Sequence, residues 1–540
     1  MKTLKYKSLA SALFISMIMG TSSCTNDLNT VPLDPQDVVS ELVFSNTIDA
    51  YQQSLAKIYA GLAMSGNAGG DGDSDVAGVD GGSQASFLRG LWNLQELTTD
   101  EAHCCWNDVG MPDFNNNSWS SSNVFIKGLY YRLYYQVNLA NAFLRETTDE
   151  KLASRGADET VKTQVKTYRA EARFMRALAY YYLLDMFRNV PFVTETSTVG
   201  TTLPQQIMAN DLFAYVEKEL TECVSDMQDP TVGYNASYGH ANKAAAWSLL
   251  SRLYLNAKTY IGTDKYTECI TYCNKVITAG YTLEPVYANM FKADNDHSKE
   301  MILPIRYEGV NTQTWGGMTF LLCSGEPSSM QSAVNAVGAW QGNRGRSSML
   351  KTFEKENGYN FDTRKSMLHT ELTTNIEIAS PGLYTNNGIP VVKYYNVNKD
   401  GSLPASNIAY TDFPLFRLGE IYLNYAEAVL RGGTGGDKTT ALKYVNDLRA
   451  RAYSDIDEAP IATSELTLDF ILEERGREFF FEAQRRTDLV RFGKYSGSSY
   501  VWPWKGGVAA GKSISDIYNV FPIPADDMGA NTNLVQNSGY

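Results

Sequence analysis

The sequence feature that most constrains the fold is an apolar stripe with the period of an α-helix. The stripe consists of Ala170, Phe174, Ala177, Tyr181 and Leu184. Successive members are four, three, four and three residues apart, so all of them lie on one face of a helix. Pro191 marks where this helix has ended, because proline cannot continue a helix. The stripe therefore predicts a long helix with one buried face.

The helical period recurs in two blocks of the chain. In the first block, residues 244–255 are predicted to form a helix, and Asp264 is predicted to be the N-cap of a second one that ends near Gly280. In the second block, residues 418–429 form a helical stripe, and Asp437 is predicted to open an antiparallel partner helix. Alternating small and aromatic residues on such helix pairs resemble tetratricopeptide repeats, although no clean 34-residue period is present.

Between these blocks the helical pattern fails. Residues 283–414 are rich in Gly, Asn, Ser and Thr, with short runs such as Val391 to Tyr395 that indicate strands. A segment this long with little regular structure is usually functional rather than a linker. We therefore expect a mostly α-helical domain over residues 41–540, in which 41–282 and 415–540 form a helical scaffold and 283–414 form a loop-rich insertion.

Composition excludes several classes of protein. The chain carries 47 Lys and Arg against 60 Asp and Glu, a formal net charge of −13, and is 44% hydrophobic and 20% charged. This balance is typical of neither a disordered chain nor a membrane protein with many spans. An acidic chain also lacks the basic footprint that nucleic acids need. We expect no nucleic-acid partner.

The N-terminus has the pattern of an export signal. Three lysines, the last of them Lys7, precede an uncharged apolar run from Ser8 to Met19 that is too short to span a bilayer. Small residues then lead directly to Cys24, which is typical of a bacterial lipoprotein. Residues 1–23 are predicted to be a signal peptide, Cys24 the acylated residue, and 24–40 a tether. A plain secretory peptide with an incidental cysteine is the alternative.

No metal site is predicted from the chain's cysteines and aspartates. His103-Cys104-Cys105 lacks a second ligand cluster, and Cys269 and Cys273 lie one helical turn apart, so buried or locally paired thiols are expected. The loop from Gly66 to Ser83 carries four aspartates and begins like a calcium loop, but other residues stand where such a loop needs Gly and Glu. We expect an ordered glycine loop, and no cofactor.

A phosphate-binding motif is present only in form. Residues 506–513 match G-x-x-x-x-G-K-[ST], including Lys512 and Ser513. A real phosphate loop follows a buried strand and opens a helix, so that backbone N–H groups converge on the phosphates. Here Trp502-Pro503-Trp504 precedes the motif and no clear helical pattern follows it. We expect no nucleotide binding at these residues.

Motifs for catalysis are also missing. The chain has no G-x-S-x-G elbow, no H-E-x-x-H motif and four histidines in total. A pair of glycosidase carboxylates is not excluded by sequence, because the distance between them decides. The densest charged cluster, at residues 473–486, is predicted to lie on one helix with i,i+4 ion pairs Glu473/Arg477 and Glu482/Arg486. No catalytic residue is predicted.

The same cluster also carries a family resemblance. It contains Glu473-Glu474-Arg475-Gly476-Arg477-Glu478-Phe479, followed by Arg485-Arg486-Thr487-Asp488-Leu489-Val490-Arg491-Phe492-Gly493. Further matches are Glu171-Ala172-Arg173-Phe174-Met175-Arg176-Ala177, Phe187-Arg188-Asn189-Val190-Pro191, Leu448-Arg449-Ala450-Arg451-Ala452, Phe521-Pro522-Ile523-Pro524 and Asn533-Leu534-Val535-Gln536-Asn537-Ser538-Gly539-Tyr540. Together they resemble the SusD/RagB family from the lipoprotein signal to the last residue.

The resemblance implies a surface lipoprotein of a Gram-negative outer membrane. Family members have a tetratricopeptide-like scaffold with a loop-rich glycan-binding face. They form a lid over a TonB-dependent, SusC-like transporter and deliver oligosaccharides without cleaving them. The likeness is greatest to the starch-binding member, so starch-like α-glucan is the first ligand expected, with dextran or another glucan second. A secreted glycoside hydrolase on a helical scaffold is the alternative from a different class.

The resemblance also implies the binding residues. In the starch-binding member an arc of three aromatic side chains supports the glucan, and the matching positions here are Trp106, Trp315 and Trp340, with Trp in place of Tyr at 315. Arg89 matches an arginine that binds sugar hydroxyls. Asn107 matches an asparagine only loosely, and with Asp108 it lies in a loop that is shorter and differently ordered. Independently, sugar C–H faces pack on indole rings, and the last two tryptophans fall in the irregular segment.

Overall fold

The computed structural model describes residues 44, 47–67, 69–70, 74–198, 200, 202–354, 361–383 and 386–540. Cys24, the expected signal peptide and the expected tether lie outside the described residues. The described chain is mainly helical, and its few strands form short two-stranded pairs. The fold class expected from the sequence is confirmed.

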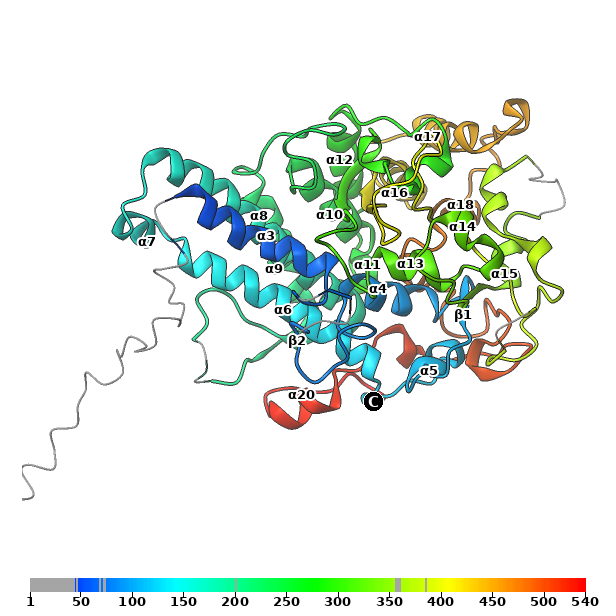
Figure 1. Cartoon of the computed structure of the whole chain (residues 1–540), viewed down its shortest axis with the longest axis horizontal. Helices are drawn as coiled ribbons and strands as arrows, with labels where there is room; N and C mark the ends of the chain where they lie inside the picture. Colours follow the sequence, from blue (N-terminus) through cyan, green and yellow to red (C-terminus); the bar gives the residue numbers. More distant parts are fainter. Residues whose placement is uncertain are drawn as a thin grey trace, which may run out of the picture.

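The first half of the chain supplies the long helices. They are α3 (Ile48–Ala63), α4 (Phe87–Glu96), α5 (Met111–Asn116), α6 (Val124–Glu146), α7 (Asp149–Ser154), α8 (Glu159–Phe187), α9 (Ala209–Cys223), α10 (Lys243–Leu255), α11 (Ala257–Ile261) and α12 (Tyr266–Ile277). Helix α8 packs against α3, α6 and α9, and these helices run side by side in the left half of Figure 1. Short strands β1 (Ala102–Cys104), β2 (Val190–Pro191) and β3 (Gln206–Ile207) lie between them in the sequence.

The second half begins with short elements and ends with helices. Its helices are α13 (Met318–Ser324), α14 (Gln331–Val334), α15 (Ser347–Lys351), α16 (Leu418–Leu430), α17 (Lys438–Ala452), α18 (Leu468–Phe479), α19 (Arg485–Arg491) and α20 (Ala525–Ala530), and its strands are β4 (Met301–Ile305), β5 (Asn343–Gly345) and β6 (Phe413–Arg417). Isolated 3₁₀ turns are η1 (Tyr287–Phe291), η2 (Asn295–His297), η3 (Ser328–Met330), η4 (Thr363–Met367), η5 (Thr370–Leu372), η6 (Ile456–Glu458), η7 (Lys505–Gly507) and η8 (Asp516–Asn519). Helices α13, α14 and α15 gather with β1 on the right of Figure 1.

The helices expected from periodicity are present, with one wrong cap. Helix α8 contains the apolar stripe; Asp158 caps it by accepting a hydrogen bond from the Val161 N–H, and it ends before Pro191. Helices α10 and α16 coincide with the predicted stripes, and Asp437 caps α17 through the Thr440 N–H. Asp264 is not the N-cap of α12, because Lys265 occupies that position without a capping side chain.

Strand pairing differs from the prediction. Residues 391–395 do not form a strand: only Val391 makes an isolated bridge, to Leu368. The side chains that follow bind the turn after α18 instead, where Lys393 Nζ lies 2.7 Å from the Phe480 carbonyl oxygen. The longest strand pair is β4 with β6, antiparallel and with irregular register. It joins two segments that are more than a hundred residues apart in the sequence.

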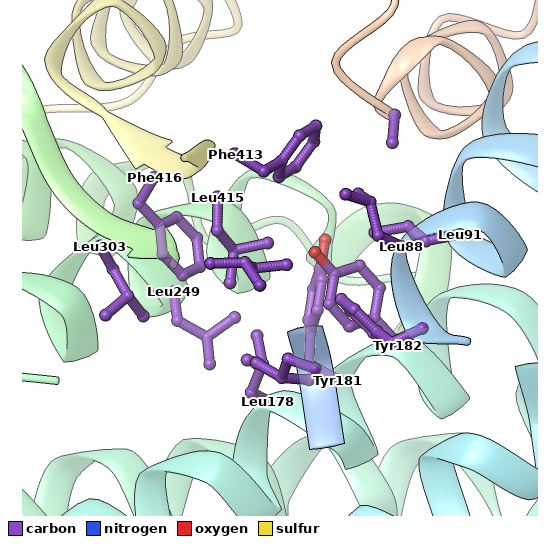
Figure 2. Packing of buried hydrophobic residues seen from close by; sticks show 14 of the residues in the cluster. Leu88, Leu91, Leu178, Tyr181, Tyr182, Leu249, Leu303, Phe413, Leu415 and Phe416 are labelled. Atoms are coloured by element: carbon purple, nitrogen blue, oxygen red, sulfur yellow. The ribbon is translucent and has the colours of Figure 1, made fainter. Parts of the chain in front are cut away.

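The core is built where the two halves meet. Figure 2 shows Leu178, Tyr181 and Tyr182 of α8 together with Leu249 of α10 and Leu415 and Phe416 of β6. All of these side chains are buried and belong to one continuous hydrophobic cluster. Leu88 and Leu91 of α4 join it from a third side. Burial of α4 matters for the site, because this helix also carries Arg89.

A second buried region is ionic, and it corrects the interpretation of residues 473–486. These residues span two helices, α18 and α19, and Glu482 lies between them. Glu482 pairs with Arg417 at 2.8 Å and with Lys393 at 2.7 Å rather than with Arg486. The i,i+4 pairing was wrong for Glu482 because the helix ends three residues before it.

The ionic network, as we call it, connects the irregular segment to the C-terminal helices. Its acidic members are Glu300, Asp362, Glu474, Glu478 and Glu482, and its basic members are Arg364, Lys393, Arg417, Arg451 and Arg477. Glu478 alone lies 2.6 Å from Arg417 and 2.8 Å from Arg364, and it also pairs with Arg451. Every side chain in the ionic network is at most 3% exposed.

The remaining motifs take structural roles. Residues 506–513 follow no strand and open no helix; Gly506, Gly507 and Gly511 adopt positive φ in consecutive turns. Asp75 of the glycine loop pairs with Lys57 at 2.9 Å, while Asp71 and Asp73 lie outside the described residues. The six cysteines of the described chain are buried and free. No described helix is both long and apolar enough to cross a membrane.

Candidate functional site

Three tryptophans that are far apart in the sequence meet on the irregular face of the molecule. The ring centroids of Trp106 and Trp340 are 6.4 Å apart at an angle of 51°. Those of Trp315 and Trp340 are 6.1 Å apart at 71°. Each of the three side chains is half-buried rather than enclosed. We call this cluster the indole platform, with Trp340 in its centre.

Backbone hydrogen bonds at or next to Trp106 and Trp340 tie these two residues to different elements. Trp106 comes two residues after β1, which pairs with β5, and the Cys105 N–H continues this ladder to the Gly342 carbonyl oxygen at 2.8 Å. The Trp340 N–H donates to the carbonyl oxygen of Cys323 in α13 at 2.9 Å. These bonds tie two tryptophans to regular structure although the tryptophans themselves lie in loops.

Two of the indoles each have a glycine packed against the ring. A Cβ atom on Gly342 would be 2.1 Å from Cε2 of Trp106, and one on Gly70 would be 2.4 Å from Cε2 of Trp315. Neither distance is possible between real atoms, so any larger residue would displace the ring. Gly70 also accepts a hydrogen bond from the Trp315 N–H at 3.3 Å. The backbone therefore approaches these rings closely from one side.

Arg89 lies beside the indole platform as a nearly buried cation. It is 7% exposed, and its guanidinium carbon lies 5.3 Å from the Trp106 ring and 4.7 Å from the Phe320 ring. Burial lowers the pKa of Arg89 to about 10, so the side chain stays charged at neutral pH. Its Nε atom has no hydrogen-bond partner among the described residues. A buried donor without a partner is available to a ligand or to water.

The loop after Trp106 places the two remaining predicted residues in solvent. Asn107 and Asp108 are exposed, and the Asp108 carbonyl oxygen accepts a hydrogen bond from the Met111 N–H at 2.9 Å. The negative charge of Asp108 partly offsets the effect of burial on the pKa of Arg89. The structure thus brings Asp108 into electrostatic reach of Arg89.

The sequence interpretation missed the residues that support the indole platform. The ring centroid of Phe320, in α13, lies 6.3 Å from that of Trp106. The guanidinium carbon of Arg89 lies 4.7 Å from the same Phe320 ring. Phe320, Gly70 and Gly342 show no local pattern that predicts this role, since their contacts form only in the folded chain. By contrast, Trp502 is fully buried, and Trp504 is half-buried with its Nε1–H donating to the Ile378 carbonyl oxygen, as expected for packing residues.

The described residues contain no cluster of three or more His, Cys, Asp or Glu that could hold a metal ion. The indole platform presents aromatic faces, one guanidinium and exposed amide and carboxylate groups. This combination suits a ligand with C–H faces and a rim of hydroxyl groups.

Comparison with known proteins identifies the family. The profile described as "SusD family" matches residues 326–540, and the profile described as "Starch-binding associating with outer membrane" matches residues 84–255. The chain is 35% identical to the starch-binding protein SusD of Bacteroides thetaiotaomicron, over the full length of both chains. The chain belongs to the SusD family. A SusD-like protein of Bacteroides ovatus is 24% identical over 76% of this chain and 74% of its own.

Solved structures share the SusD fold. A "Laminarin binding SusD-like protein" is 20% identical, covers 92% of this chain with all of its own, and superposes with a TM-score of 0.66. Surface glycan-binding protein A of Bacteroides thetaiotaomicron, in complex with laminarihexaose, is 20% identical, covers 91% of this chain and 99% of its own, and gives a TM-score of 0.65. At this identity the structures establish the fold alone.

Proposed function

We propose that this chain binds a glucan on the indole platform, outside the cell, and passes it to a TonB-dependent transporter. Membership of the SusD family and the starch-binding relative support glycan binding. The observation that carries the proposal is the convergence of Trp106, Trp315 and Trp340. Trp106 and Trp340 also pack against the core, and the parts of the three rings that remain in solvent form an aromatic surface on which a ligand can stack.

A starch-like α-glucan is the first ligand, and dextran or another glucan is the second. The indole rings are tilted by 51° and 71° against each other, so a flat ligand cannot stack on all three. A chain that curves can follow these changes of direction, with its C–H faces on the rings. Arg89, Asn107 and Asp108 would then meet the hydroxyl groups at the rim.

Alanine substitution of each platform tryptophan tests the proposal. Each change should weaken glucan binding by about 2 kcal/mol or more, because a stacked and desolvated indole behaves as a hot spot. Isothermal calorimetry against soluble starch, dextran and laminarin measures both affinity and preference. Arg89→Ala should have a smaller effect, since water replaces part of a hydroxyl contact.

Trp247→Ala is the matched control, because Trp247 is half-buried on α10 and belongs to no part of the indole platform. It should leave binding unchanged. Melting temperature is recorded for every variant. Trp106→Ala, Trp315→Ala and Trp340→Ala proteins that bind glucan normally, or that unfold, would show that these rings are packing residues and that the site is elsewhere.

The chain is proposed to bind without cleaving. The competing function is a secreted glycoside hydrolase, which would use two carboxylates at a fixed separation. Release of reducing sugar from soluble glucans by the pure protein decides between them. Sustained release of reducing sugar by an activity that co-purifies with the chain would favour the hydrolase.

A lipid on Cys24 is proposed to hold the protein at the outer membrane, next to its transporter. A Cys24→Ala protein should leave the membrane fraction when the transporter is absent, because the single acylated residue is then lost. The transporter contact itself is expected to bury more than about 2,000 Å². Co-purification should therefore persist at high salt, where exposed charge pairs are screened.

A further inference from the structure

A cavity separate from the indole platform lies beside helix α3. Its volume is about 360 Å³, it is open to solvent on one side, and it is lined by α3, by the turn at residues 238–240, by residues 304–308 and by Thr312. None of the platform tryptophans lines it. Cavities of this size hold small organic ligands in other proteins.

One wall of the cavity is apolar and open because α3 presents small side chains. Ala56, Ala60 and Ala63 follow each other at helical spacing on this face, and Pro304 and Ile305 of β4 also line the cavity. Larger side chains at the alanine positions would fill the space. The wall therefore suits the C–H face of a small ring.

Arg306 supplies a charge at this cavity. Its guanidinium lies 5.4 Å from the Tyr238 ring, and Nη1 donates to the Tyr238 carbonyl oxygen at 3.4 Å. No ion pair joins Arg306 to a carboxylate of the described chain, although its charge acts to lower the pKa of the buried Asp412 and the Glu308 side chain also lines the cavity. Arg306 is exposed to solvent and also lines the cavity, so its guanidinium is accessible to a ligand.

The backbone is shaped to hold Arg306 in place. Gly239 has a φ of +88°, and a Cβ atom there would be 2.2 Å from Cδ of Arg306. The arginine side chain thus lies directly across the glycine. Tyr238 is fixed in turn, because its hydroxyl group donates to Asp412 Oδ2 at 2.8 Å. The guanidinium is positioned by packing rather than by charge.

His240 provides a second donor. Its Nδ1 atom lies 2.9 Å from Oε2 of Glu171, and the Tyr59 hydroxyl donates to the same oxygen at 2.5 Å. The hydrogen bond with Glu171 raises the pKa of His240, which favours the protonated ring. With Nδ1 engaged by Glu171, the Nε2–H is the donor that remains for a ligand; the side chain is 32% exposed.

We propose that this cavity binds a small carboxylate whose remaining atoms form a C–H-rich ring, with the carboxylate against Arg306 and His240 and the ring against the alanine wall of α3. A planar guanidinium pairs with a carboxylate through two parallel hydrogen bonds, which gives both strength and orientation. Acidic sugars and simple ring carboxylates share this chemistry. The site does not depend on the function proposed for the indole platform.

Ligand titration by calorimetry and saturation-transfer NMR tests the proposal, using the full mature chain. Glucuronate is the acidic sugar, glucose its neutral counterpart, and benzoate a ring carboxylate that is not a sugar. We expect glucuronate to bind at least tenfold more tightly than glucose. Benzoate binding as tightly as glucuronate would support the carboxylate site and assign it to ring acids in general; weaker benzoate binding would support it and assign it to acidic sugars.

Two variants locate the ligand. Arg306→Gln keeps most of the side-chain length without the charge and should weaken glucuronate binding at least tenfold, and Ala60→Leu should fill the cavity with a similar loss. Arg145→Gln, at the end of α6 and outside the cavity, is the matched control and should bind as the parent does. Melting temperatures establish that all variants fold.

Trp340→Ala separates the cavity from the indole platform: it should keep glucuronate binding while it loses glucan. Equal binding of glucose and glucuronate, or full binding by Arg306→Gln, would overturn the proposal. So would the absence of carboxylate binding at millimolar concentration, or loss of glucuronate binding in Trp340→Ala, which would place the ligand on the indole platform instead.

Discussion

The indole platform and the ionic network reverse the usual distribution of side chains. On the platform, three large apolar rings are partly exposed to solvent, whereas in the ionic network charged side chains are almost completely buried. Charged residues are rarely buried unless they are paired, and the network satisfies this condition many times over. The partly exposed rings are where we propose that the ligand binds, while the buried charges attach the loop-rich face to the helices.

The paired residues of the ionic network come from both the irregular segment and the C-terminal helices. Glu300 and Arg364 come from the irregular segment, and Glu478 comes from α18. Arg417 at the end of β6 pairs with both Glu300 and Glu478, at 2.9 and 2.6 Å. Disturbing the ionic network should therefore lower the stability of the fold, whereas disturbing the indole platform should change binding alone.

Glu478→Gln is expected to have the largest effect on stability. The substitution removes a charge that faces Arg364, Arg417 and Arg451, so buried arginines lose their compensation. Breaking a buried pair in this way costs about 3–5 kcal/mol of the free energy of unfolding. Urea denaturation measures it. Glucan affinity of the folded fraction should stay near that of the parent.

Glu159→Gln is the control for this change, because Glu159 pairs with Lys162 on the surface of α8 and its side chain is 88% exposed. Exposed pairs contribute less than about 1 kcal/mol. A similar small loss in Glu478→Gln would mean that the ionic network does not hold the irregular segment to the helices.

The ionic network and the indole platform should also differ in how pH affects them: the first changes stability in acid, and the second does not change binding. Burial alone would raise the pKa of Glu478, but the charges of Arg451, Arg417 and Arg364 outweigh it and lower the pKa to about 2 from an ordinary 4.5. A carboxylate with a lowered pKa stabilises the fold above its unfolded pKa, and that stability is lost as the pH falls from 4.5 toward 2.

The free energy of unfolding should therefore be nearly constant between about pH 7 and 5 as far as Glu478 is concerned, and should fall progressively in more acidic solution. Urea midpoints across this range measure it. Glucan affinity should not change between about pH 7 and 5, because indoles do not titrate and Arg89 stays charged. A stability that is unaffected by acid would contradict the charge pairing described for Glu478.

Gly342→Ala should change binding more than stability. The added methyl group would lie 2.1 Å from Trp106, and φ of Gly342 is not in the left-handed region, so the ring rather than the backbone must move. We expect a loss of roughly 1 kcal/mol in glucan affinity, about half that of a lost hot spot. Gly382→Ala, in the same irregular segment with no atom within 4 Å of the new Cβ, is the control. Equal binding by both variants would show that the position of Trp106 is unimportant.

Much of the scaffold could be predicted from the sequence, because its information is local. The stripe of α8 and the Asp437 cap of α17 depend on neighbours within a few residues, and both are present. The pairing of β4 with β6 was not predicted, because each strand has five residues, contains a proline and finds its partner far along the chain.

The candidate site also contains residues that could be predicted from the sequence and residues that could not. The family resemblance identified Trp106, Trp315 and Trp340, and the fold brings them together. Gly70, Gly342 and Phe320 could not be predicted, because a close approach of backbone to ring is a property of the tertiary structure. For the same reason the partners of Glu482 were wrong: i,i+4 spacing means little once the helix has ended.

Lys512→Ala should have the smallest effect on stability and binding. It serves as a reference for variants of both the indole platform and the ionic network. Lys512 has the position of a phosphate-binding lysine in the sequence motif, but its side chain is exposed among turns that no strand precedes. Exposed side chains without such a role change stability by less than about 0.5 kcal/mol, and glucan affinity should equal that of the parent. Thermal denaturation with and without ATP and Mg²⁺ checks the motif directly, since a ligand selective for the folded state must raise the melting temperature. A nucleotide-dependent rise that Lys512→Ala abolishes would add a third functional region to the molecule, and the contrast between a binding face and a structural interior would then be incomplete.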